Sequence, residues 1–237
     1  MLRGAMRESR SSAVYEAVIR RILSGEYRPG QLLNRKAVAE DLSVSIVPVN
    51  DAFTQFQSEG IIQTVPRKGT FVAQLDWRDL VELTIVRSAL EVEAARAYCG
   101  TRIQSQREQM LELADRVDNA PPVTFEYLHA DVVFHRKLVS LAGNRYLLSV
   151  LGTVMARGLL LAMEAILTTQ SEPVTASHRE FVDDLCSATP ETVGAIVRRN
   201  ILTAKQALIR LDKAWGDGQD AGSSLDVLLS IMGELDE

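Results

Sequence analysis

The sequence has few cysteines and few aromatic residues, and it lacks the motifs of common cofactor sites. Its two cysteines, Cys99 and Cys186, are too far apart for a zinc ribbon or a CxxC redox pair. No glycine-rich nucleotide loop, GxSxG or HExxH motif occurs. The longest apolar stretch, 146–169, carries Arg157 and Glu164, which favours a buried core helix over a membrane span. We therefore expect a cytoplasmic protein without a membrane segment or secretory signal.

The charges are unevenly distributed along the 237 residues. The formal net charge is -5, yet residues 1–75 hold ten Lys and Arg against seven Asp and Glu. Phosphate attraction is local, because salt screens it within about 10 Å. An acidic remainder therefore does not prevent a basic first segment from binding nucleic acid. Length and pattern predict a flexible arm over 1–10, a first domain over 11–75, a second over 76–215 and an acidic tail over 216–237.

The first domain has the pattern of three short helices and a hairpin. Apolar residues recur at helical spacing over 11–24, and a short helix is expected over 35–42. A third helix should follow Ser45 as its N-cap, with Val49, Phe53 and Phe56 in the core. Two β-type runs then flank residues 66–69. This order predicts a winged helix-turn-helix with a two-stranded wing.

Such a module would present its third helix to the major groove of double-stranded DNA. Basic side chains at the second helix and the wing would bind phosphates, and the start of the third helix would face base edges. The candidate DNA-binding residues are Arg35, Lys36, Ser45, Ile46, Val47, Asn50, Arg67 and Lys68.

The run from GEYRPGQLL through VPVNDAFTQFQSEG to PRKGTFV resembles the DNA-binding domain of the GntR family of bacterial regulators. Family members usually carry arginine where this chain has Lys36, Ile46 and Asn50. Isoleucine has no donor for guanine or phosphate, whereas Asn50 can pair with adenine and Ile46 can touch a thymine methyl. The sequence therefore predicts an operator richer in A·T pairs, or a module whose DNA binding is lost.

The second domain reads as an antiparallel all-α bundle, so the fold class is mainly α with a small β wing. Helices are expected near 77–99, 103–119, 122–142, 144–169, 174–188 and 190–215, with breaks at glycine and proline. Asp131 and His135 are four residues apart and share a helix face, and His178 and Asn200 lie in later helices. Converging oxygen and imidazole ligands suit a divalent ion such as Zn, Ni or Mn.

The segments VRSALEVEAAR, DVVFHRKLVSLAGN and SHRE resemble the FCD effector-binding domain of the FadR subfamily. In metal-binding members the ligands are one aspartate and three histidines, which implies Asp131, His135, His178 and the position of Asn200. An amide is a poorer ligand than imidazole, so Asn200 would bind weakly or through water. Three interpretations stay open: a metal with three protein ligands, a metal-free pocket for an organic acid, and core polar residues without a ligand.

A fixed guanidinium would hold an anionic effector through paired hydrogen bonds. Arg87 is the first candidate for this role and Arg157 the second, although Arg157 could instead pair with Glu164 or Glu91. The sequence thus predicts a ligand-responsive regulator, most simply a repressor, that binds a two-fold DNA site as a homodimer and senses a small organic acid. The alternatives are a ligand-binding protein without DNA binding and, more remotely, a metal-dependent hydrolase or lyase.

Overall fold

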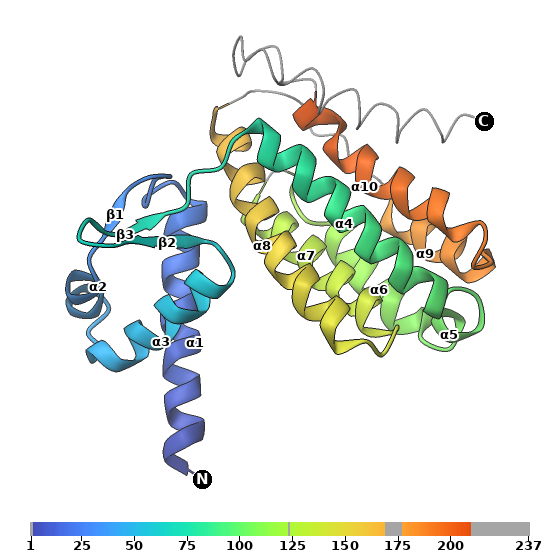
Figure 1. Ribbon diagram of the computed structural model, residues 1–237. Coiled ribbons are helices and arrows are strands. Elements are labelled where there is room, and N and C mark those ends of the chain that lie inside the picture. The colour runs from blue at the N-terminus through green and yellow to red at the C-terminus, as the bar shows by residue number, and fades with distance from the viewer. Residues whose placement is uncertain (1, 123, 169–176, 210–237) are drawn as a thin grey trace.

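The computed structural model describes residues 2–122, 124–168 and 177–209, and the chain forms a small head and a larger helical bundle (Figure 1). The predicted acidic tail 216–237, the last residues of the final predicted helix and the start of the predicted helix at 174 lie outside the described residues. The fold class is the one predicted from the sequence, namely mainly α with a small antiparallel sheet.

The head contains three helices and three short strands. They are α1 (Leu2–Leu23), β1 (Leu32–Leu33), α2 (Arg35–Asp41), α3 (Ile46–Ser58), β2 (Ile62–Val65) and β3 (Gly69–Val72). Helix α3 packs against α1 through Phe53 and Phe56, which are fully buried together with Val49. Tyr15 of α1 stacks on Phe56 with ring centroids 4.4 Å apart. Val49, Phe53 and Phe56, the core residues expected from the sequence, therefore form the apolar face that holds α3 in place.

Two features of the head differ in detail from the sequence predictions. Helix α1 already begins at Leu2, so residues 2–10 of the predicted arm are helical, and the flexibility of this arm stays a prediction. Most residues in this segment are good helix formers, and no proline interrupts it. The second feature is a third strand, since the predicted hairpin is present as β2 and β3, and β1 joins it in the order β1-β3-β2. A run of two residues has no periodicity of its own, and only its pairing of Leu32 with Phe71 identifies it as a strand.

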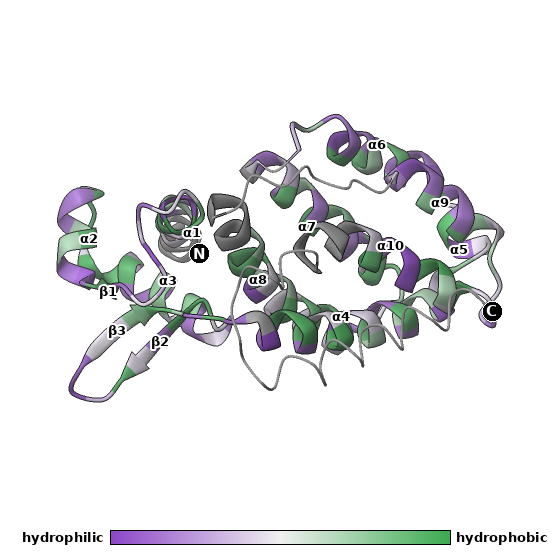
Figure 2. Ribbon diagram, turned by 90° about the horizontal axis from the view of Figure 1, so that it is seen from above, coloured by the Kyte–Doolittle hydropathy of each residue, from purple (hydrophilic) through white to green (hydrophobic). Residues whose placement is uncertain are grey.

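The bundle consists, in its described part, of helices only. They are α4 (Trp77–Tyr98), α5 (Thr101–Gln104), α6 (Arg107–Asp118), α7 (Phe125–Ser140), α8 (Arg145–Thr168), α9 (His178–Ser187) and α10 (Val193–Ile209). Viewed from above, the helices surround a mainly apolar interior, with polar residues toward the outside (Figure 2). The capping box at the start of α4, between Asp76 and Asp79, fixes where the bundle begins.

Helix α8 contains the one window among the described residues, Arg145–Ala162, that is long and apolar enough for a membrane span by length and composition alone. It packs against α4, α7 and α1. Only 33% of this window is buried, so α8 is less enclosed than the buried core helix expected from the sequence. Tyr146 and Val150 near its start are exposed.

Head and bundle share a hydrophobic cluster. Val18 and Ile22 of α1 belong to the same buried cluster as Leu80 of α4 and Leu160 and Leu161 of α8. A second cluster lies wholly inside the bundle. Because the first cluster spans both parts, helix α8 is in direct contact with the head. In Figure 1, α8 lies on the side of the bundle that faces the head.

Candidate functional site

The start of α3 presents a free face to solvent. Ile46 and Val47 are 39% and 45% exposed, and Asn50 is exposed beside them. The sequence prediction that these residues point outward while Val49 points inward is confirmed.

The N-termini of helices α2 and α3 are capped differently. Ser45 occupies the N-cap of α3, but its side chain makes no capping hydrogen bond, so the expected cap bond is wrong. Its hydroxyl group is exposed next to Ile46. At α2 the cap is formed by Asn34, whose side-chain oxygen accepts hydrogen bonds from the amides of Lys36, at 2.9 Å, and Ala37, at 3.3 Å.

Arg35 is held by the core. Its guanidinium carbon lies 5.2 Å from the ring centroid of Phe53, a cation–π contact. Its Nε atom is buried and has no hydrogen-bond partner among the described residues. The side chain is therefore fixed against the head, whereas Lys36, the next residue, is exposed.

The basic tip of the hairpin projects from the head, away from the bundle (Figure 2). Arg67 and Lys68 are both exposed between β2 and β3, and Arg67 has a positive φ of 64°. Gly69 follows with a φ of 125°, and a Cβ there would clash with the end of the Leu32 side chain. Glycine is favoured at this position because an L side chain is strained at such a φ.

The second candidate site is a buried cluster inside the bundle. Asp131 and His135 of α7 and His178 of α9 each offer a ligand atom, and these atoms lie within 4.8 Å of one another. Nε2 of His135 is 3.4 Å and Nε2 of His178 is 3.3 Å from the same oxygen, Oδ1 of Asp131. The sequence prediction that these three residues converge is confirmed.

Two carboxylates that the sequence analysis missed orient the imidazoles. Nδ1 of His135 lies 2.7 Å from Glu91 Oε2, and Nδ1 of His178 lies 2.7 Å from Asp118 Oδ1. Each histidine thereby directs its Nε2 toward Asp131. Paired carboxylates behind ligating histidines are the usual support of metal centres. Glu91 follows the identified Arg87 by one helical turn, which is a weak signal, and nothing in the sequence links Asp118 to His178.

The donor set fits a divalent metal ion. At bond lengths of about 2.0–2.1 Å, tetrahedral ligands are separated by about 3.3 Å, close to the two distances from Asp131 Oδ1. The charges of the cluster also favour a bound cation. Asp131, Glu91 and Asp118 bring three carboxylates, whereas Arg87 brings one cation. With neutral histidines, a divalent ion would balance this excess.

The ionisable side chains of the cluster shift one another's pKa values. Burial by itself would raise the pKa of Glu91, but its electrostatic and hydrogen-bond interactions with His135 and Arg87 outweigh burial and lower that pKa to about 2. Burial also opposes ionisation of Asp131, yet His135, His178 and Arg87 hold its pKa well below the usual range. Burial would lower the pKa of His135, but Glu91 and Asp131 raise it. Both acids are thus charged at neutral pH.

Asn200 is buried on α10, as expected for a residue near the cluster. Among the contacts between described residues, no hydrogen bond or ion pair joins it to Asp131, His135 or His178. Its participation in a metal site therefore stays a prediction.

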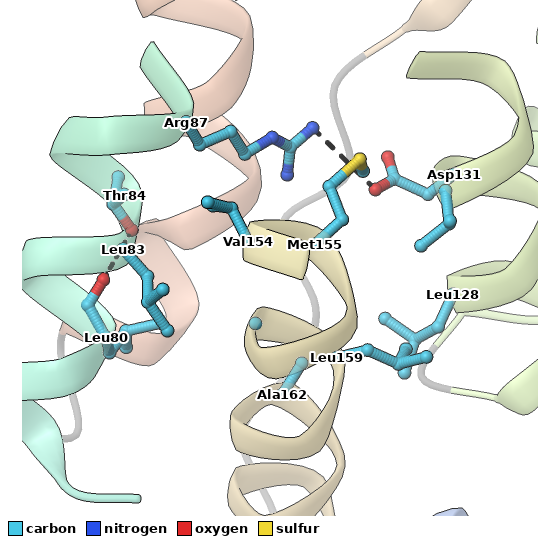
Figure 3. A pocket seen from close by; sticks show the side chains of 12 residues that line it. Leu80, Leu83, Thr84, Arg87, Leu128, Asp131, Val154, Met155, Leu159 and Ala162 are labelled. Atoms are coloured by element: carbon cyan, nitrogen blue, oxygen red, sulfur yellow. Dashed lines mark hydrogen bonds and ion pairs between the residues drawn. The ribbon is translucent and has the colours of Figure 1, made fainter. Parts of the chain in front are cut away.

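The two arginines proposed for an effector lie in different places. Arg87 is 93% removed from solvent, donates from Nε to Glu91 Oε1 at 2.6 Å and has Nη2 3.9 Å from Asp131 Oδ2. It lines a pocket between α4, α7 and α8 (Figure 3). Arg157 does not line this pocket, and its described ion-pair partner is Asp79, at 3.5 Å. Arg157 lies on the side of α8 that faces the head, near Gly60, and its expected role at an effector stays a prediction.

Known proteins resemble both parts of the chain. Residues 10–72 match the model of bacterial regulatory proteins of the gntR family, and residues 82–203 match the FCD domain. The "Probable D-xylose utilization operon transcriptional repressor" of Paenarthrobacter nicotinovorans is 28% identical over 76% of this chain and 80% of its own length. The "Nta operon transcriptional regulator" of Aminobacter aminovorans is 29% identical over 57% of this chain and 65% of its own length.

Solved structures share the fold. A GntR transcriptional regulator from Rhodococcus sp. RHA1 superimposes with a TM-score of 0.61 at 23% identity, over 84% of this chain and 98% of that one. Escherichia coli McbR/YncC gives a TM-score of 0.53 at 16% identity, over 93% and 97%. The order of a gntR-type winged helix and an FCD domain is the FadR-type architecture, and relatives of this kind are regulators rather than enzymes. The chain belongs to the gntR family of bacterial transcriptional regulators, with an FCD domain as its C-terminal half.

Proposed function

We propose that this regulator binds a two-fold operator as a homodimer and that a small organic acid in the bundle changes its affinity for DNA. The observation that carries the proposal is the double position of Asp131, which lines the pocket beside Arg87 and also belongs to the cluster with His135 and His178. The carboxylate of an acid bound beside Asp131 would contact both the guanidinium of Arg87 and the proposed metal site. Names of relatives include repressors, which favours repression as the default action.

On DNA, the exposed start of α3 would enter the major groove. Ser45, Ile46, Val47 and Asn50 would face base edges, and Asn50 offers the donor and acceptor that adenine requires. Phosphates would be bound by cations on both sides of this face, namely Arg35, Lys36, Arg67 and Lys68. The fixed position of Arg35 on Phe53 favours a defined phosphate contact, because little side-chain entropy is lost on binding.

In the bundle, Asp131, His135 and His178 would hold a divalent ion such as Zn, Ni or Mn, with Asn200 contributing weakly or through water. The ion supplies an open coordination position for a carboxylate. Glu91 and Asp118 keep the imidazoles in place, and Arg87 neutralises the acid. Neither a base nor a nucleophile is needed for this role, which is binding rather than catalysis.

A homodimer is proposed because a two-fold site needs two recognition helices about 34 Å apart, and one head supplies one. Exposed apolar side chains on the bundle, Val86, Val133, Tyr146 and Val150, are compatible with contact to a second copy. We place the protein in the cytoplasm, where DNA and reduced cysteines are found.

The test is selection of bound fragments from genomic DNA at one stated salt concentration, followed by titration of the enriched site. We expect an enriched sequence with two-fold symmetry, bound by two copies of the chain. Arg67→Ala should weaken binding to all sites and reduce the slope of log affinity against log salt by about one. Arg116→Ala is the matched control, since it removes an equal charge from the exposed face of α6. No enriched sequence and a flat salt response would indicate that DNA binding is lost.

A further inference from the structure

The pocket between α4, α7 and α8 has two chemically different ends (Figure 3). Arg87 and Asp131 lie at one end, in the upper part of the view, next to the buried cluster. The other end is lined by aliphatic side chains from all three helices, namely Leu80, Leu83, Leu128, Leu159 and Ala162. A ligand that fills the pocket must therefore be polar at one end and apolar at the other.

The polar end accepts an anion. Arg87 uses Nε for Glu91, and its Nη2 is still 3.9 Å from Asp131, too far for a hydrogen bond. The guanidinium therefore retains donors that a carboxylate can accept from. Thr84, the remaining polar side chain of the lining, donates its hydroxyl hydrogen to the carbonyl of Leu80 at 2.7 Å. It adds no free donor.

The apolar end offers no partner to a hydroxyl or a second carboxylate. The lining there comes from leucine and alanine side chains, and the backbone behind them is helical and already hydrogen bonded. A polar group placed in this part would lose its water without a replacement hydrogen bond, and this weakens binding. Sugar acids, hydroxy acids and dicarboxylic acids are therefore poorly matched to this end.

We infer that the effector is a monocarboxylic acid with an apolar tail, its carboxylate at Arg87 and its tail among Leu80, Leu128 and Leu159. The inference rests on the proposed acid-sensing function and names the chemical class of the acid. Each methylene that enters the apolar end should tighten binding about fourfold until the end is filled.

The tail would also reach the contact between bundle and head. Leu80 belongs to the cluster shared with α1, and Leu83, Leu128 and Leu159 pack against that cluster. The cavity is only about 40 Å³, which is room for a few water molecules. A tail must therefore displace its walls, and the α8 wall touches the head. The change in DNA affinity should accordingly grow with the length of the tail.

The experiment measures binding of butanoate, hexanoate and octanoate to the full, zinc-loaded chain by calorimetry, with malate and citrate as polar acids. Gly158→Leu provides the discriminating variant, because Gly158 lines the pocket on α8 and a Cβ there meets nothing within 4 Å. It should weaken octanoate at least tenfold and leave butanoate within about threefold. Ser149→Leu is the control, since it adds the same side chain to an exposed position of α8. Gly158→Ala serves if the leucine variant does not fold.

Tightening from butanoate to octanoate, lost in Gly158→Leu and retained in Ser149→Leu, supports the inference. Malate or citrate binding more tightly than octanoate, or equal affinities along the series, overturns it and leaves acid sensing intact. The same holds if Gly158→Leu weakens every acid equally. Absence of binding by all five acids overturns both the inference and the proposed function.

Discussion

Arg157 of α8 lies directly against Gly60, which comes two residues after the end of α3. A Cβ at Gly60 would come within 3.0 Å of Cδ of Arg157, and Gly60 has a positive φ of 71°. Nη2 of Arg157 lies 3.5 Å from Oδ1 of Asp79 near the start of α4. A single side chain thus contacts the turn behind the recognition helix and the first helix of the bundle.

Gly60→Ala should destabilise the protein by about 1–2 kcal/mol, because an L side chain is strained at positive φ. The new methyl group would also displace Arg157. Denaturant unfolding measures the change. Gly158→Ala is the matched control, since Gly158 lies inside α8 with open space around its Cβ position. That variant should be unchanged or more stable by about 0.5–1 kcal/mol. Equal losses in both variants would contradict the account of Gly60.

Protein purified without a chelator should contain up to one divalent ion per chain by elemental analysis. His135→Ala should abolish this metal, because it removes a ligand whose atom lies 3.4 Å from Asp131 Oδ1. His129→Ala, on the same helix but outside the cluster, should retain it. Metal that persists after His135→Ala would place the site elsewhere.

Glu91→Gln should weaken metal binding about 10- to 100-fold without removing a ligand, because the amide holds the imidazole of His135 less firmly than a carboxylate. Competition with a chromogenic chelator measures the affinity. Glu93→Gln is the control, since Glu93 is exposed on the same helix and pairs only with Arg96 among its described contacts. If the two variants bind metal equally, Glu91 does not act on the site.

Asn200→His should tighten metal binding, because imidazole is a stronger ligand for these ions than an amide. Titration of the metal-free protein with zinc in a competing chelator tests this directly. No gain in affinity would mean that α10 does not bring position 200 to the metal.

Ile46→Arg should move the preferred operator toward G·C pairs, because arginine pairs bidentately with guanine, at about 1–3 kcal/mol of discrimination per base. Selection from a randomised pool, read by sequencing, shows the shift. Ile46→Leu keeps an apolar side chain at this exposed position and should leave the preference unchanged. The same selected sequence for all three proteins would remove position 46 from the DNA interface.

Local features of the head were predictable from the sequence. The spacing of Val49, Phe53 and Phe56 identified the buried face of α3. That left Ile46 and Asn50 on the outside, where they are found. Strand β1 was missed because its two residues become a strand only by pairing with β3.

The candidate metal site, too, was predictable where its residues are close in the chain and not where they are far apart. Asp131 and His135 share a helix face by their spacing alone, and the resemblance to FCD domains brought in His178. Glu91 and Asp118 could not be paired with the histidines, because they lie 44 and 60 residues away from them in the chain. Arg157 was assigned to an effector because nothing local distinguishes a pocket-lining arginine from one that meets a neighbouring domain.

The sequence by itself determined the helices, their buried faces, the basic head and the shared helix face of Asp131 and His135, since each depends on residues within a few turns of one another. Only the tertiary structure decided which carboxylate supports which imidazole, where the pocket changes from polar to apolar and that α8 contacts the head. These relations join segments far apart in the chain, and the packing of α4, α7, α8 and α9 brings them together.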